Sequence, residues 1–161
     1  MDADADYLFA ADRGVIMVRW RRPNPRAVDQ LTDQILSKCD EADAPVMVVV
    51  IIDHETPTPD AETRTAFDRG LEMFGDRVQG QHIVLLGEGL QMTVIRSVVT
   101  TMMLVAGLRG RKVFVHKDIA AITSLVTERS GRSAREFITW LRTRTLLSGA
   151  EADAALAKLG A

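Results

Sequence analysis

The residues best placed for chemistry follow the most apolar segment of the chain. Residues 46–52 read Val-Met-Val-Val-Val-Ile-Ile, and Asp53, His54 and Glu55 come directly after them. Open α/β sheets bind ligands at the carboxyl ends of their strands, so a site is expected here. Two carboxylates favour the charged form of the imidazole between them, and all three groups are metal ligands. Adjacent residues rarely converge on one ion, however, and no second histidine has suitable spacing, so we expect a solvated loop and no metal.

The same loop carries hydroxyl groups and a helix start. Thr56, Thr58 and Asp60 alternate with Pro57 and Pro59. Thr58 or Asp60 can cap the helix that follows, with Pro59 in its first turn. A phosphate on Thr58 would lie at the N-terminus of that helix, where free amides and the helix dipole favour negative charge. Capping explains Thr58 fully, so we favour it over phosphorylation.

A second candidate lies where another strand passes into a helix. Gly87-Glu88-Gly89 occupies this junction, and backbone amides at such a place can contact an anion. The segment lacks the Lys-Ser/Thr of a phosphate loop and the third glycine of a dinucleotide fingerprint. Arg96 interrupts the apolar helix that follows and needs a partner, which makes Gly87, Gly89 and Arg96 the candidate anion or ligand contacts. The acidic candidates for that partner are Asp53, Glu55 and Glu88.

The remaining reactive side chains form no catalytic pattern. Cys39 falls on an apolar helical stripe, which predicts a core position. His82 and His116 lie in or beside strands, and no serine or carboxylate has the spacing of a triad. A basic run near the C-terminus has few aromatic neighbours, so nucleic acid is not an expected partner. Its members are Arg129, Arg132, Arg135, Arg142 and Arg144. No cofactor is expected.

Hydrophobic periodicity predicts strands alternating with helices. The predicted strands are 7–11, 15–20, 46–52, 82–86 and 113–115. The predicted helices are 25–42, 60–80, 90–108 and 118–131, with capped helices beginning near Ser133 and Ser148. Strands joined through helices run parallel with right-handed crossovers, whereas the first two strands form a hairpin. The expected fold class is therefore α/β, with a mixed β-sheet opened by a hairpin, flanked by helices and extended by C-terminal helices.

Size and composition predict one folded domain. The chain has 161 residues, of which 47% are hydrophobic, enough for a core without disulfides or metal. A single cysteine and an acidic start without a secretory signal predict a cytoplasmic protein. The longest apolar stretch, 90–108, contains Arg96. A membrane span tolerates a central arginine poorly, so we expect a buried helix and no membrane span.

The element order over residues 6–130 resembles that of STAS domains, named for sulfate transporters and anti-sigma factor antagonists. The resemblance is carried by the opening hairpin, the strand 46–52, the polar loop after it and two further helix–strand units. It implies a bacterial regulatory module that binds a kinase or another protein. In anti-sigma factor antagonists, a serine in an Asp-Ser-Ser-Gly-like segment at the following helix start is phosphorylated. The corresponding stretch here, 53–60, has no serine and no glycine, and Thr58 is its nearest hydroxyl.

Two functional hypotheses follow. The first is a non-enzymatic regulatory or protein-interaction module with a STAS-like core, 1–131, and a C-terminal helical extension, 132–161, packed on the core or on a partner. Its switch or partner surface would be Asp53, His54, Glu55, Thr56, Thr58 and Asp60. The apolar residues of the extension must be buried, which makes a homodimer the economical assembly; they are Phe137, Trp140, Leu141 and Leu147. The alternative is a small-ligand-binding protein or enzyme that uses the strand ends around Asp53, Glu55, Glu88 and Arg96.

Overall fold

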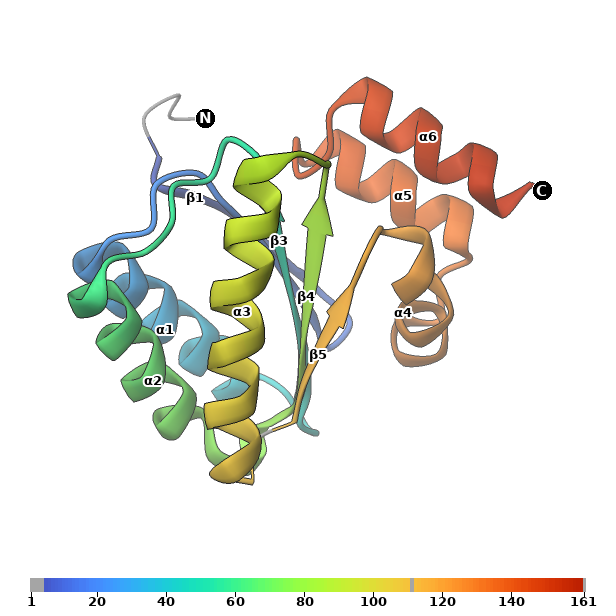
Figure 1. The fold of residues 1–161 in the computed structure, drawn as a ribbon. Helices are drawn as coiled ribbons and strands as arrows, with labels where there is room; N and C mark the ends of the chain where they lie inside the picture. The colour runs from blue at the N-terminus through green and yellow to red at the C-terminus, as the bar shows by residue number, and fades with distance from the viewer. Residues whose placement is uncertain (1–4, 111, 161) are drawn as a thin grey trace.

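A five-stranded mixed sheet lies between two layers of helices in the computed structural model, which describes residues 5–110 and 112–160 (Figure 1). The α/β class predicted from the sequence is confirmed. The strands are β1 (Tyr7–Asp12), β2 (Val15–Trp20), β3 (Val46–Asp53), β4 (Val78–Leu86) and β5 (Val113–His116). They lie side by side in chain order, β1-β2-β3-β4-β5.

A tight hairpin opens the sheet. Strand β1 pairs with β2 antiparallel, from Tyr7 opposite Trp20 to Asp12 opposite Val15. The two residues between the strands, Arg13 and Gly14, both have positive φ, 48° and 76°. This is the backbone that a two-residue turn needs to match the right-handed twist of its strands. The other neighbouring pairs, β2·β3, β3·β4 and β4·β5, are parallel.

Three helices cover one face of the sheet: α1 (Pro25–Asp40), α2 (Ala61–Phe74) and α3 (Leu90–Leu108). Each connects two neighbouring parallel strands in the same direction along the sheet. Right-handed crossovers that all step in one direction place their helices on one face. Because the strand order never reverses, the sheet has no switch point, and the crevice that such reversals open for ligands is not formed.

The opposite face is covered by α4 (Thr123–Ser130), α5 (Ala134–Thr143) and α6 (Gly149–Leu159) (Figure 1). The side chains of Phe137, Leu141 and Leu147 are at most 2% exposed there and pack with β2 and β3 residues such as Met17 and Ile51. Phe137, Leu141 and Leu147 are therefore buried in the chain's own core, and Trp140 is partly buried against it. This removes the argument for a homodimer that rested on their need for a partner.

The boundary between α2 and β4 differs from the sequence prediction. The expected helix ran to Gly80. In the structure the helix ends at Phe74, a short 3-10 turn covers Gly75–Arg77, and Val78 begins the strand. Gly75 has φ 54° and ψ −136°, a backbone conformation that glycine adopts far more readily than other residues, and it ends the helix there.

The prediction that residues 90–108 form a buried helix is wrong in its second part. The segment is helical, but only four of its 19 residues are buried: Met92, Ile95, Val99 and Ala106. Leu90 and Leu108 are 84% and 89% exposed. By length and composition α3 could cross a membrane. This is weak evidence, because core helices of soluble proteins pass the same test. Here it lies along the sheet beside β5.

Truncating Phe137 tests whether the C-terminal helices belong to the folded core. We expect Phe137→Ala to lower the free energy of unfolding by about 3–5 kcal/mol, because the aromatic ring is fully buried and its removal leaves a cavity. Urea denaturation measures this change. Thr139→Ala, an exposed change on the same helix, is the control and should cost less than about 1 kcal/mol. Equal effects of the two substitutions would contradict the packing described here.

Candidate functional site

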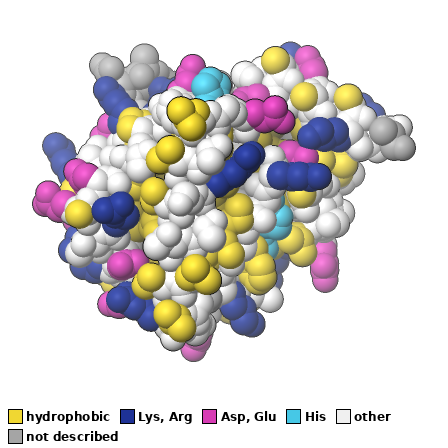
Figure 2. All heavy atoms as spheres, viewed as in Figure 1, with side chains coloured by type: hydrophobic (Ala, Val, Ile, Leu, Met, Phe, Trp, Pro, Cys, Tyr) yellow, Lys and Arg dark blue, Asp and Glu magenta, His cyan; other side chains and the backbone are white. Residues whose placement is uncertain are grey.

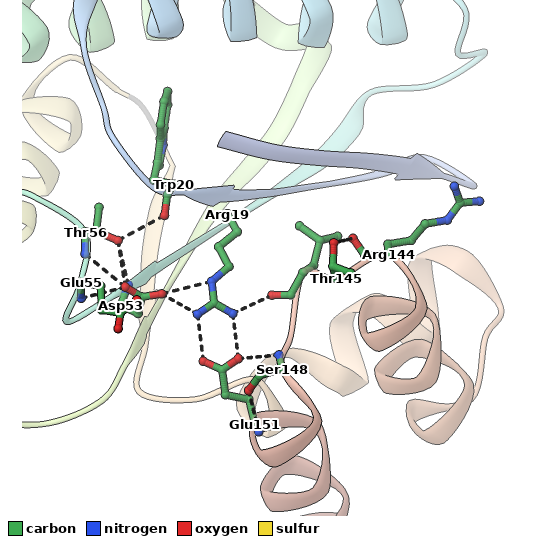
Figure 3. A network of polar contacts seen from close by, with 10 residues as sticks. Arg19, Trp20, Asp53, Glu55, Thr56, Arg144, Thr145, Ser148 and Glu151 are labelled. Atoms are coloured by element: carbon green, nitrogen blue, oxygen red, sulfur yellow. Dashed lines mark hydrogen bonds and ion pairs between the residues drawn. The ribbon is translucent and has the colours of Figure 1, made fainter. Parts of the chain in front are cut away.

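Arg19 joins the carboxyl end of the sheet to the last helix. It lies on β2, on the face covered by α4–α6, and its guanidinium contacts Asp53 at the end of β3 and Glu151 on α6 (Figure 3). The Nε and Nη2 atoms donate to Asp53 Oδ2 at 3.1 and 2.5 Å. The Nη1 and Nη2 atoms donate to Glu151 Oε2 and Oε1 at 2.7 and 3.0 Å. We call these three residues the Arg19 cluster.

The guanidinium of the Arg19 cluster has no donor left for a ligand. Nη1 also donates to the carbonyl oxygen of Leu146 at 3.1 Å. An arginine has five N–H donors, and the five contacts use all of them. The Arg19 side chain is only 16% exposed, and it joins segments far apart in sequence: Asp53 lies 34 positions after it and Glu151 132 positions after it. The cluster therefore acts as a structural clamp.

Both carboxylate oxygens of Asp53 are occupied. Oδ2 accepts hydrogen bonds from the Arg19 guanidinium, and Oδ1 accepts from the backbone amides of Glu55 and Thr56 at 2.9 and 3.1 Å. Burial opposes ionisation, but the hydrogen bonds and charge of Arg19, with the Glu55 amide and the Thr56 hydroxyl, outweigh it and lower the pKa of Asp53. The pKa of Glu151 is lowered in the same way: burial opposes ionisation, and Arg19 and the Ser148 amide outweigh it. Both side chains are thus held as carboxylates.

Thr56 fixes the loop between β3 and α2 from the inside. Its side chain is buried, and Oγ1 lies 3.2 Å from the carbonyl oxygen of Trp20, from Asp53 Oδ1 and from the Asp53 amide. His54, Glu55 and Thr58 are exposed. The predicted switch surface therefore divides into two buried anchors, Asp53 and Thr56, and exposed residues between and after them.

Asp60, and not Thr58, caps α2. The Asp60 carboxylate accepts from the Thr63 amide at 2.8 Å, which lowers the pKa of Asp60. Pro59 precedes the helix, so its expected place in the first turn is wrong. Thr58 lies two residues before the cap, and among the described residues its hydroxyl makes no hydrogen bond. The reason for preferring a capping role for Thr58 is therefore removed.

An open depression of about 660 Å³ lies at the carboxyl ends of β3, β4 and β5. Charged side chains of both signs gather there, between the start of α3 and α6 (Figure 2). It brings together part of the predicted ligand set: Asp53, His54, Gly87, Glu88 and Arg96. Lys117, Asp118, Glu151 and Lys158 also line it, whereas Glu55 and Gly89 do not.

The predicted ion pair of Arg96 is not formed. Arg96 is exposed, and its Nη2 donates to the carbonyl oxygen of Gly87 at 3.3 Å instead of contacting Asp53, Glu55 or Glu88. Asp53 is already held by Arg19, and an arginine on the open side of α3 needs no buried partner. The depression has no serine, threonine or cysteine in its lining to serve as a nucleophile. Among the described residues, no group of three or more His, Cys, Asp or Glu side chains is arranged to hold a metal ion.

Two histidines that the sequence left unconnected lie in contact. His82 Nδ1 and His116 Nε2 are 3.0 Å apart, and the His82 ring stacks on Phe114. Burial and the neighbouring His116 lower the pKa of His82; burial lowers that of His116, with Asp118 opposing. Strand pairing explains the contact, because His82 lies opposite Phe114 and Val84 opposite His116.

Three of the five C-terminal arginines, Arg129, Arg132 and Arg142, bind other parts of the chain. Arg132 contacts Asp12 at 2.5 Å and lies over the ring of Trp140. Arg129 donates to the carbonyl oxygen of Pro45, and Arg142 pairs with Asp153 at 3.4 Å. The basic run is thus divided among contacts with the hairpin, the start of β3 and α6.

The Arg19 cluster was missed in the sequence, although one signal was present. Arg19 shares a face of β2 with Val15 and Met17, so an apolar inward row ends in a charge that needs a partner. The sequence predicted a capped helix that begins near Ser148, and the cap includes Glu151 in a capping box. The structure confirms that cap and shows that the same carboxylate also binds Arg19.

Comparison with known proteins adds no assignment: no family model, curated protein or solved structure matches the chain. The resemblance to STAS domains therefore stays a prediction.

Replacing Arg19 tests the clamp. Arg19→Met leaves two carboxylates facing each other without a cation and should lower the free energy of unfolding by about 3 kcal/mol at pH 7. The folded-state pKa values of Asp53 and Glu151 lie below their unfolded values, near 4. The stabilisation by these two ionised carboxylates is therefore complete above about pH 5. It is lost as the pH falls from there through the folded-state pKa values of Asp53 and Glu151. The difference between wild type and variant should narrow from pH 7 to pH 3 in urea denaturation.

Arg142→Met is the control for this prediction. Arg142 and its partner Asp153 are both more than half exposed, so this change should cost less than about 1 kcal/mol at either pH. An Arg19→Met effect as small as the control, or a difference that does not change with pH, would contradict the clamp.

Proposed function

We propose that the chain is a non-enzymatic regulatory or protein-interaction module resembling STAS domains, and that it contacts its partner through the exposed residues of the β3–α2 loop. The observation that carries this proposal is the construction of the loop. Asp53 and Thr56 fix it to the sheet through buried hydrogen bonds, while His54, Glu55 and Thr58 point to solvent. A loop held in one conformation binds a partner with little loss of conformational entropy.

The charged groups beside the loop support binding over catalysis. Asp53 uses both carboxylate oxygens, and Arg19 uses all five donors, within the chain. Neither group is free to exchange protons with a substrate or to hold one. A cytoplasmic location accords with this role, since the fold has no disulfide and its one cysteine, Cys39, is buried.

Charge and size changes on the loop test the proposal. Glu55→Lys combined with Thr58→Arg should reduce capture of the partner at least tenfold, because the partner must contact these side chains. The full chain is immobilised and exposed to lysate of its source, and bound proteins are quantified by mass spectrometry. Sedimentation of the same variant shows whether the partner is a second copy of the chain.

The matched control makes the same two kinds of change on α4. Ser124 and Glu128 are exposed and lie on the other side of the sheet, so Glu128→Lys with Ser124→Arg should leave capture unchanged. If no protein is lost specifically from the loop variant, and its self-association equals that of wild type, the proposed surface is wrong.

A second candidate function is binding of a small anion in the depression at the strand ends. Two cations there form no salt bridge among the described residues: Arg96 donates only to a carbonyl oxygen, and Lys117 acts on the neighbouring Asp118 without a direct ion pair. Glu88 lies in the same depression and opposes an anion, which is why this candidate stands second.

Phosphate titration followed by NMR tests the second candidate. Amide shifts at residues 87–90 should saturate with phosphate in wild type and should be lost in Arg96→Gln/Lys117→Gln. Arg64→Gln removes an exposed cation from α2, away from the depression, and should leave the titration unchanged. Shifts that are absent in wild type, or equal in all three proteins, exclude the anion site.

A further inference from the structure

The helical layer over the sheet is incomplete between α2 and α3. Val50 and Ile52 lie on the middle strand, β3, and face this layer, yet both are only half-buried. Ile83 on β4 is also half-buried on the same face. Residues in the middle of a sheet are normally sealed by the helices above them. Here α2 packs against α1, and α3 lies toward β5, so the strip of sheet between α2 and α3 lacks full cover.

A narrow apolar slot fills this gap. Its volume is about 120 Å³, and its floor runs along β3 from Val48 to Ile52, a length of about 13 Å at roughly 3.3 Å per residue. Phe67 and Leu71 of α2 form one wall, and Val98 and Met102 of α3 form the other. The slot is partly open and lined mainly by apolar side chains. An engineered apolar cavity of similar volume is known to take up small hydrocarbons.

The two hydroxyl groups in the described lining of the slot are already used within the chain. The hydroxyl of Thr32 donates to the Val28 carbonyl oxygen at 2.8 Å, and the hydroxyl of Thr56 is held by Trp20 and Asp53. The polar side-chain groups that remain in this lining are the indole N–H of Trp20 and the amide of Gln81, which lies at the end near the start of β5. A smaller depression continues from that end, sharing Gln81 and Val113, and includes the exposed Lys112.

We propose that the slot binds the unbranched hydrocarbon chain of a single-chain amphiphile, with its anionic head group at the Lys112 end. The length and narrowness of the slot suit a linear chain better than a fused ring. Met102 and Met103 on the α3 wall are flexible and can adapt to a chain longer than the slot holds. This site is separate from the β3–α2 loop surface and does not depend on its proposed role.

The exposed side of α3 does not offer an equivalent site. Its apolar side chains, such as Leu90, Val94 and Leu104, are exposed to solvent and line neither the slot nor the depression at the strand ends. The apolar residues at the slot recur instead every three or four positions along α3, at Ile95, Val98 and Met102. The same helix therefore supplies Val98, which lines the slot, and Val94, a valine that does not line it.

Calorimetric titration of the full chain with sodium dodecanoate below its micellar concentration tests the proposal. Wild type should bind, and Val98→Phe should bind at least tenfold more weakly, because the ring occupies the slot. Filling the slot should also raise the melting temperature of Val98→Phe without ligand. Val94→Phe makes the same change on the 47%-exposed side of α3 and should match wild type in affinity. No binding by wild type, or equal loss in both variants, overturns the proposal.

Two further measurements keep the test independent of variant folding. In wild type, dodecanoate should shift the methyl resonances of Val98, Val99 and Ile83, and leave those of Val126 and Ile138, on the other face, unchanged. Shifts on both faces would overturn the site. Lys112→Gln should weaken dodecanoate but not 1-dodecanol; equal affinity of wild type for the two ligands would overturn the assignment of an anionic head group.

Discussion

The contact between Arg19 and two carboxylates decides how the two ends of the chain fit together. β2 is an inner strand whose row Val15, Met17 and Arg19 faces the C-terminal helices, so a charge enters an otherwise apolar interface. Leaving that charge unpaired would be costly, and Asp53 and Glu151 pair with it from β3 and α6. With these contacts formed, α5 and α6 cover the sheet as part of the core. The same contacts hold the start of the β3–α2 loop, so the clamp also positions the surface proposed to meet a partner.

The two faces of the sheet are consequently covered to different degrees. The face under α4–α6 has fully buried residues from both layers, Met17 and Phe137 among them. On the other face, α1 and α2 pack together, while α3 buries four of its 19 residues and leaves half-buried sheet residues such as Val50 beside it. The slot between α2 and α3 is partly open, so its apolar walls stay in contact with water when nothing fills it. An occupant of the slot would cover these walls and stabilise the fold, which links the loose packing of α3 to ligand binding.

Local patterns in the sequence predicted most of the fold. The hairpin and the capped helices that begin near Ser133 and Ser148 depend on residues within a few positions, and all are present. The site was less predictable because it depends on distant contacts. Asp53 was singled out, but its partner Arg19 lies 34 positions away and Glu151 is 132 from Arg19. Composition also predicted that α3 is buried, and this prediction was wrong. A run of apolar residues does not show how much of the sheet remains for the helix to cover.

Native-state hydrogen exchange measured residue by residue tests the central claim, that the Arg19 cluster makes the sheet and the C-terminal helices one cooperative unit from which α3 is excluded. Amides in α6 should exchange only through global unfolding, with the same free energy as those in β3, whereas amides in the middle of α3 should exchange through an opening of lower free energy. Two results would contradict the claim. In the first, amides of α6 exchange with a lower opening free energy than amides of α3. In the second, amides of α3 and of the whole sheet exchange with the same opening free energy.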